Sequence, residues 1–309
     1  MNVSSPTPAI IFGPREWAML LGLSAIWGAS FFFTAIALDG GLPPFTVIFA
    51  RVFIAAILLQ TFCRLTGRPL PRGLRGWAPY LLLGLLNNAL PFTLLALAQT
   101  QISSALTSVL NATTPLWTVF LAHMLTGDEK LTVSKTAGIL LGIGGVAVMI
   151  GLDALSGIGN SFWGQLSVIG ATLSYGFAAI YGRRFHRERP MVTATAQVTM
   201  SSSILLPVML IVDRPWTLAA PPAPALLSVL ALGILSTAVA YLLFFRLLAR
   251  AGATNTSLVT FIVPVNAILL GTTILGERLS LTDGIGMTMI MIGLITIDGR
   301  LLRRRRPGA

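Results

Sequence analysis

The sequence predicts an all-α integral membrane protein in which ten transmembrane helices form two inverted five-helix repeats. Hydrophobic residues make up 55% of the 309 residues and charged residues only 10%, whereas soluble domains carry about 25% charged residues. The mean hydropathy of +0.83 shows the same bias. Long apolar windows recur along the chain, and the second half of the sequence repeats the first. We therefore expect the chain to lie in a membrane.

Ten apolar windows are each about 20 residues long, the length that a helix needs to cross a hydrocarbon core of about 30 Å. We expect transmembrane helices at 16–38, 44–64, 76–99, 102–125, 132–151, 162–183, 191–212, 223–248, 252–275 and 281–299. The connections are short and leave no room for a soluble domain. The first window is too long, and too closely followed by the second, for a cleaved signal peptide.

The two halves of the chain repeat each other at an offset of 149 residues, which becomes 148 after one deletion. The first offset aligns Gly84 with Gly233, Ser108 with Ser257 and Pro115 with Pro264, and the second aligns Glu129 with Glu277, Gly138 with Gly286 and Gly145 with Gly293. Because each repeat holds an odd number of helices, the copies must cross the membrane in opposite senses. We expect repeats at 16–151 and 162–299 and a basic cytoplasmic tail at 300–309.

Positive charge is unevenly distributed over the connections. With the N-terminus placed inside, 18 of the 21 Lys and Arg residues fall on the cytoplasmic side, while Arg214 and Arg278 fall outside. This bias follows the positive-inside rule and predicts that both termini are cytoplasmic. The net charge of +11 is therefore assigned to orientation in the bilayer and to anionic lipid near the tail. We expect the lipid bilayer, and no nucleic acid, as a partner.

The residues that build metal centres and hydrolytic sites are scarce. Cys63 is the only cysteine, and His123 and His186 are the only histidines, so we expect no disulfide and no metal site with such ligands. The sequence contains neither the G-x-x-x-x-G-K-[ST] loop for ATP nor the G-x-S-x-G turn of serine hydrolases. We expect no cofactor and no catalytic residue. An integral-membrane enzyme and a structural membrane protein remain as alternatives.

Several short stretches carry a family resemblance. They are "IWGASFFFTAIAL" at 26–38, "FARVFIAAILL" at 49–59, and the paired turns "GDEKLT" at 127–132 and "GERLS" at 276–280. Together with the duplication they resemble EamA-type members of the drug/metabolite transporter superfamily, most of all the bacterial aromatic amino acid and metabolite exporters. The resemblance spans about 16–299. It implies an inner-membrane exporter with a cavity between its halves, and with the fifth and tenth helices as scaffold.

Prolines inside the expected helices mark a candidate site. Each proline frees the carbonyl four residues before it. The prolines are Pro91, Pro115, Pro207 and Pro264, and the residues four positions earlier are Asn87, Asn111, Ser203 and Thr260. Transporters built from inverted repeats bind substrates near the midplane, where helices are interrupted. The freed carbonyls are either satisfied within the kinked helix or offered to a ligand, and both interpretations stay open.

Polar and aromatic side chains complete the candidate site. The window at 102–125 carries a polar stripe at helical spacing, which its counterpart at 252–275 repeats; such stripes also occur in ordinary helix packing. The residues predicted to bind a small-molecule substrate are Trp27, Phe31, Asn87, Asn88, Pro91, Asn111, Pro115, Tyr175, Tyr241, Thr260 and Pro264.

The distribution of charge narrows the substrate. All ten carboxylates lie at window ends or in connections, so none is placed to hold an organic cation or to relay a proton in the membrane. We expect a neutral or zwitterionic solute such as an amino acid, aromatic ones included, with an organic cation or drug as the alternative. Arg51 is expected to reach the outer interface or to pair with Asp39 or Glu277, and a functional role stays open as the alternative. A monomer is compatible with all of these features.

Overall fold

The computed structural model describes residues 13–127, 130–150 and 160–298. Three of the acidic residues considered above, Asp128, Glu129 and Asp153, and the basic tail at 300–309 lie outside the described residues. Within the described ranges all regular structure is helical. The predicted all-α class is confirmed for this part of the chain.

The first half forms seven α-helices and one π-helical segment. They are α1 (Pro14–Asp39), α2 (Pro44–Leu65), α3 (Gly73–Gly84), η1 (Leu85–Ala89), α4 (Leu90–Gln99), α5 (Ser104–Asn111), α6 (Thr114–Leu125) and α7 (Val133–Ile150). The segment η1 joins α3 to α4 without a break in the helix. The window predicted at 102–125 is divided into α5 and α6, because residues 112 and 113 form a turn.

The second half follows the same order from α9 onward. Its elements are α9 (Asn160–Gly182), η2 (Arg183–Phe185), α10 (Pro190–Val212), η3 (Pro215–Thr217), α11 (Ala223–Gly233), the π-helical η4 (Ile234–Val239), α12 (Ala240–Thr256), α13 (Val259–Thr273) and α14 (Leu281–Asp298). A kink at Gly252, with φ of 75° and ψ of 166°, ends the straight part of α12. This kink falls at the start of the window predicted at 252–275, and a turn at residues 257 and 258 then divides that window before α13.

Many of these helices are long and apolar enough to cross a bilayer. Among the described residues, eight meet the length and composition of a membrane span, and α13 is a shorter apolar helix. The 23-residue α9 is not one of the eight. The chain is therefore a multi-pass membrane protein.

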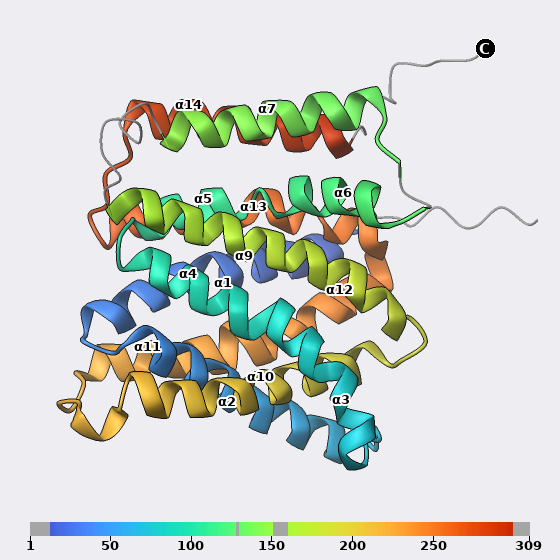
Figure 1. Cartoon of the computed structure of the whole chain (residues 1–309), viewed down its shortest axis with the longest axis vertical. Coiled ribbons are helices and arrows are strands. Elements are labelled where there is room, and N and C mark those ends of the chain that lie inside the picture. The colour runs from blue at the N-terminus through green and yellow to red at the C-terminus, as the bar shows by residue number, and fades with distance from the viewer. Residues whose placement is uncertain (1–12, 128–129, 151–159, 299–309) are drawn as a thin grey trace, which may run out of the picture.

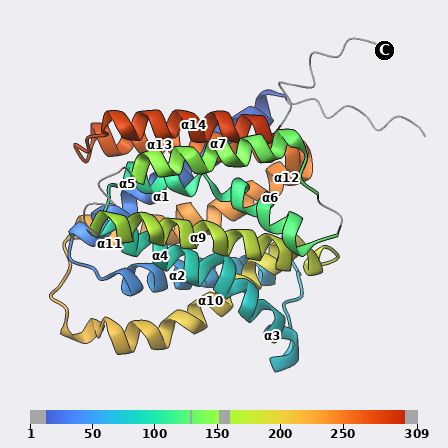
Figure 2. The same cartoon turned by 45° about the horizontal axis from the view of Figure 1, so that its top comes forward.

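The helices α7 and α14 form a separate pair at one edge of the molecule (Figures 1 and 2). Glycines allow their backbones to touch. A Cβ added at Gly138 would lie 2.6 Å from the carbonyl oxygen of Gly293, and one added at Gly145 would lie 2.6 Å from that of Gly286. The sequence offset of 148 exchanges these two contacts, so the pair packs about a pseudo-twofold axis.

A second pair of glycines repeats this relation between other helices. A Cβ at Gly84 would lie 2.5 Å from the carbonyl oxygen of Gln197, so this glycine brings α3 against α10. A Cβ at its counterpart Gly233 would lie 2.6 Å from the Cβ of Ile54, so that glycine brings α11 against α2. The duplication seen in the sequence is therefore a duplication of helix contacts.

The charged turn at 276–280, between α13 and α14, contacts the first repeat through Glu277. The Glu277 carboxylate accepts hydrogen bonds from the backbone N–H groups of Ser104, at 2.7 Å, and Ala105, at 2.9 Å. These N–H groups lie at the start of α5, where they have no acceptor within the helix and where negative charge is favourable. The glutamate of the second repeat thus caps a broken helix of the first.

Candidate functional site

A cavity of about 520 Å³ lies between the two repeats. Its lining residues come from α1, α2, α4, α5, α6, α9, α10, α12, α13 and the two π-helical segments. None of the lining residues belongs to α7 or α14, which form the separate pair of Figure 1.

Eight of the eleven predicted site residues line this cavity. They are Trp27, Phe31, Asn87, Asn111, Tyr175, Tyr241, Thr260 and Pro264. The other three, Asn88, Pro91 and Pro115, are described but are not among the lining residues. Asn88 is fully buried and donates from Nδ2 to the Tyr241 hydroxyl at 2.9 Å, so it supports the wall from behind.

Amide side chains fix the Tyr241 ring in the wall. The Tyr241 hydroxyl oxygen also accepts from Gln197 Nε2 at 3.2 Å, and Gln197 Oε1 accepts from Asn87 Nδ2 at 3.1 Å. The chain of hydrogen bonds joins η1, α10 and α12. The sequence reasoning missed Gln197, although an amide within an apolar window is a visible signal.

Both π-helical segments border the cavity at equivalent places. The sequence offset of 149 aligns η1 with the first five residues of η4 and makes Thr237 the counterpart of Asn88. A π-turn widens a helix and is frequent at functional sites. Asn88 holds Tyr241, and Thr237 lines the cavity itself. Only η1 is followed by a proline, so the proline pattern could not predict η4.

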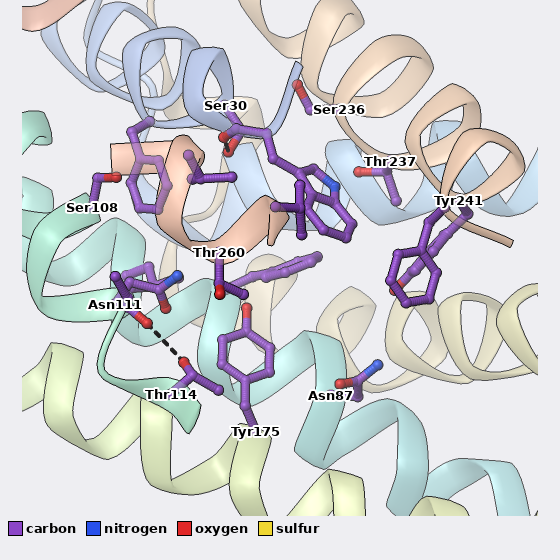
Figure 3. A pocket seen from close by; sticks show the side chains of 18 of the residues that line it. Ser30, Asn87, Ser108, Asn111, Thr114, Tyr175, Ser236, Thr237, Tyr241 and Thr260 are labelled. Atoms are coloured by element: carbon purple, nitrogen blue, oxygen red, sulfur yellow. Dashed lines mark hydrogen bonds between the residues drawn. The ribbon is translucent and has the colours of Figure 1, made fainter. Parts of the chain in front are cut away.

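Asn111 lies at the break between α5 and α6. Its carbonyl oxygen, which Pro115 frees, accepts from the Thr114 hydroxyl at 2.7 Å (Figure 3). Of the two interpretations left open by the sequence, local satisfaction therefore holds for this carbonyl. The Asn111 side chain differs, because its Oδ1 is buried and has no hydrogen-bond partner among the described residues. The same is true of the Ser108 hydroxyl and of Gln99 Oε1, which also line the cavity.

Aromatic rings form a continuous wall along α1 and α12. Trp27 packs against Phe244 with ring centroids 5.6 Å apart, Phe244 lies 5.1 Å from Phe245, and Phe245 lies 6.1 Å from Tyr241. Tyr175 projects from α9 toward Thr260 (Figure 3). Phe244 and Phe245 were not predicted, because nothing in an apolar run shows which rings turn inward.

The expectation for Arg51 was wrong. Arg51 is only 8% exposed and lines the cavity, rather than reaching the outer interface. Its Nε donates to the Thr237 hydroxyl at 3.0 Å, and its Cζ lies 3.9 Å from the centre of the Phe92 ring. Glu277, one proposed partner, binds the start of α5 instead. Arg51 is the only charged residue among the described residues that line the cavity.

The described residues offer no group of three or more His, Cys, Asp or Glu side chains that could hold a metal ion. His123 lies near the end of α6, and its Nδ1 accepts from the backbone N–H of Leu131 at 3.3 Å. It is not among the residues that line the cavity.

Comparison with known proteins assigns the family. The model of the EamA-like transporter family matches the chain twice, at residues 16–151 and 162–297. The chain belongs to the EamA-like transporter family. The two matches correspond to the two EamA repeats that the glycine contacts and π-helical segments relate to each other.

Curated relatives cover nearly the whole chain. The uncharacterized inner membrane transporter YedA of Escherichia coli (strain K12) is 26% identical over 290 residues, which cover 93% of this chain and 92% of YedA. The uncharacterized transporter YoaV of Bacillus subtilis (strain 168) is 25% identical over 289 residues, covering 93% and 97%. The chloroplastic WAT1-related protein At3g02690 of Arabidopsis thaliana is 26% identical over 294 residues, covering 92% and 69%.

A solved crystal structure has the same fold. It superposes with a TM-score of 0.66 at 21% identity and covers 94% of this chain and 100% of its own. The family and the names of the relatives support a membrane transporter; they do not give a substrate. The substrate must be argued from the cavity.

Proposed function

We propose that the chain is a secondary transporter that exports small neutral or zwitterionic metabolites, amino acids including aromatic ones among them. It would work by alternating access across a bacterial inner membrane, as a monomer. One observation carries the proposal: a cavity between the repeats combines an aromatic wall with buried polar atoms that lack partners. Such a cavity offers stacking surface to an apolar solute and hydrogen bonds to its polar groups.

The proposal includes ten membrane spans. The eight long apolar helices, the 23-residue α9 and the shorter α13 together supply that number. The distribution of Lys and Arg supports a cytoplasmic position for both termini. In this orientation the turn at 276–280 lies outside, and the cavity lies near the midplane, where inverted repeats usually bind substrates.

The charges of the cavity favour this proposal over an organic-cation exporter. Among the described residues the only charged one that lines the cavity is an arginine, and a positive wall repels a cation in a medium of low dielectric constant. Because no carboxylate in the described part of the chain lines the cavity, we propose facilitated exchange or flux down a gradient rather than strict proton coupling.

Counterflow in liposomes tests the proposal. Purified protein is reconstituted with unlabelled tryptophan, phenylalanine or leucine inside, and uptake of the labelled amino acid is measured with and without a pH gradient. We expect uptake well above protein-free liposomes in both conditions. Absence of uptake for all three amino acids would contradict the proposed substrates, and uptake only with a pH gradient would contradict the proposed exchange.

A further inference from the structure

Arg51 is the least compensated group in the cavity wall. Its side chain is almost completely buried, yet no Asp or Glu of the described residues forms an ion pair with it. Only Nε has a hydrogen-bond acceptor, the hydroxyl of Thr237. Among the described residues neither Nη1 nor Nη2 has one.

A buried charge of this kind needs a reason. Removing a guanidinium from water costs several kcal/mol unless an opposite charge and hydrogen bonds replace the water. The Phe92 face, 3.9 Å from Cζ, supplies a cation–π contact, and one hydroxyl supplies an acceptor. Guanidinium carries five N–H donors in a planar fork that matches a carboxylate, so most of its capacity to donate is left unused.

Phe92 and Thr237 hold the guanidinium from two sides. Phe92 comes from α4 of the first repeat, and Thr237 comes from the π-helical η4 of the second. The Thr237 hydroxyl is itself oriented, because it donates to the Leu232 carbonyl at 2.9 Å. With Nε and one face fixed in this way, the remaining donors are positioned for a ligand in the cavity that Arg51 lines.

Acceptors without partners lie on the other side of the cavity. Figure 3 places Ser108 and Asn111 at one side and Thr237 at the opposite side. Asn111 Oδ1 and the Ser108 hydroxyl are buried and have no partner among the described residues. The cavity therefore has a cationic donor at one end, hydrogen-bond acceptors at the other, and the Tyr175 ring between them.

We infer that Arg51 binds a substrate carboxylate, with Nη1 and Nη2 donating to it while Nε remains on Thr237. The inference rests on the proposed function and deepens it, because it makes a carboxylate beside an apolar or aromatic body the recognised feature, with or without an ammonium group. Asn111 and Ser108 accept from the substrate's ammonium group where one is present. Thr237 and Phe92 are positioning residues, which act through Arg51.

Four probes of similar shape separate the chemical groups. L-phenylalanine carries both charges, 3-phenylpropanoate carries only the carboxylate, phenylalaninamide lacks it, and phenethylamine carries only the amine. Each is tested for transport in liposomes and for protection of the protein in detergent against thermal unfolding. We expect the wild-type chain to prefer the two carboxylates over the other two probes by about tenfold or more.

The variant Arg51→Gln keeps a hydrogen-bonding side chain but removes the charge. We expect a rise of about 10- to 100-fold in the concentration for half-maximal transport of L-phenylalanine. This range corresponds to about 1.4 to 2.8 kcal/mol at 1.4 kcal/mol per tenfold change. The preference over phenylalaninamide should disappear, and Arg51→Lys should restore part of it. Arg75→Gln, at an exposed arginine of α3, should leave the preference unchanged.

The outcomes separate the two proposals. If none of the four probes is transported or protects the wild-type chain, the proposed function fails and the inference fails with it. If phenylalaninamide and phenethylamine are transported as well as the carboxylates, transport stands and the inference is wrong. A folded Arg51→Gln variant that keeps the carboxylate preference also overturns it. Should Arg51→Gln not fold, the four-probe comparison on the wild-type chain decides alone.

Discussion

Tyr241→Phe tests the hydrogen-bonded wall of the cavity. The change removes one oxygen atom that accepts from Asn88 at 2.9 Å and from Gln197 at 3.2 Å. Asn88 is fully buried, so water cannot replace the acceptor that its donor loses, whereas Gln197 borders the cavity. A buried donor left without a partner costs about 1–3 kcal/mol. Since the Gln197 bond is the longer of the two, we take the Asn88 donor alone and expect a loss of about 1–3 kcal/mol.

The single buried cysteine provides the assay. Cys63 is the only cysteine of the chain and is buried, so a thiol-reactive fluorogenic dye reports unfolding in detergent. At about 2 °C per kcal/mol for a chain of this size, the unfolding temperature should fall by about 2–6 °C. The matched control is Tyr175→Phe, because Tyr175 lines the same cavity and its hydroxyl makes no hydrogen bond to the described residues.

The double variant Tyr241→Phe with Asn88→Leu strengthens the test. Replacing both partners of a buried hydrogen bond by apolar groups is nearly neutral, whereas removing one partner is not. The double variant should therefore be more stable than Tyr241→Phe alone. Equal unfolding temperatures for Tyr241→Phe, Tyr175→Phe and the wild-type chain would refute the reasoning.

Three further predictions follow from the fold and the site. Asn111→Ala removes a buried acceptor worth about 0.5–1.5 kcal/mol, so the apparent affinity for amino acids in liposomes should fall several-fold to about tenfold. The control Thr288→Ala on α14, whose hydroxyl donates to the Gly284 carbonyl of its own helix, should leave this affinity unchanged. An unchanged affinity for Asn111→Ala would place the polar end of the site elsewhere. Gly145→Val adds a side chain whose Cβ alone would lie 2.6 Å from the Gly286 carbonyl oxygen, so the yield of folded protein and its unfolding temperature should fall. Gly22→Val should be tolerated, because no neighbouring atom lies near the position of its Cβ. Equal stability of the two variants would contradict the close contact between α7 and α14. Single cysteines at Ser134 and Ser280 in a Cys63→Ala chain should differ in labelling, because an impermeant reagent added to right-side-out vesicles should reach only Ser280→Cys; labelling of both or of neither would contradict the inverted topology.

The all-α class and the duplication could be predicted from the sequence because both depend on patterns that repeat over many residues. Apolar windows of span length are determined by the bilayer, and the offsets that align Gly84 with Gly233 and Gly138 with Gly286 reappear as helix contacts. The positions at which the fourth and ninth windows are interrupted were harder to predict from the sequence. Residues 112 and 113 end α5 just before Pro115, but the corresponding interruption in the second half falls at 257 and 258, well before Pro264. A proline permits a break and does not determine its place.

The lining of the cavity was predicted in part. Eight of the eleven predicted residues line the cavity, because polar and aromatic residues inside apolar helices usually face other helices rather than lipid. The places of Arg51 and Gln197 in the cavity wall could be found only from the structure. The position of a long side chain along its helix does not tell which neighbour it will contact. Asn88 is not among the residues that line the cavity, because its buried amide donates to the Tyr241 hydroxyl behind the wall.

Chemical blocking of the cavity tests most directly the claim that the substrate passes through it. Thr260→Cys in a Cys63→Ala chain places one thiol on α13 in the cavity wall, and the chain is treated with N-ethylmaleimide in liposomes. We predict that labelling abolishes amino acid counterflow and that the transported amino acid slows the labelling; Thr288→Cys serves as the control, for which neither effect should occur. Counterflow at the unlabelled rate in fully labelled Thr260→Cys protein, with labelling unaffected by the amino acid, would show that the substrate does not pass through this cavity.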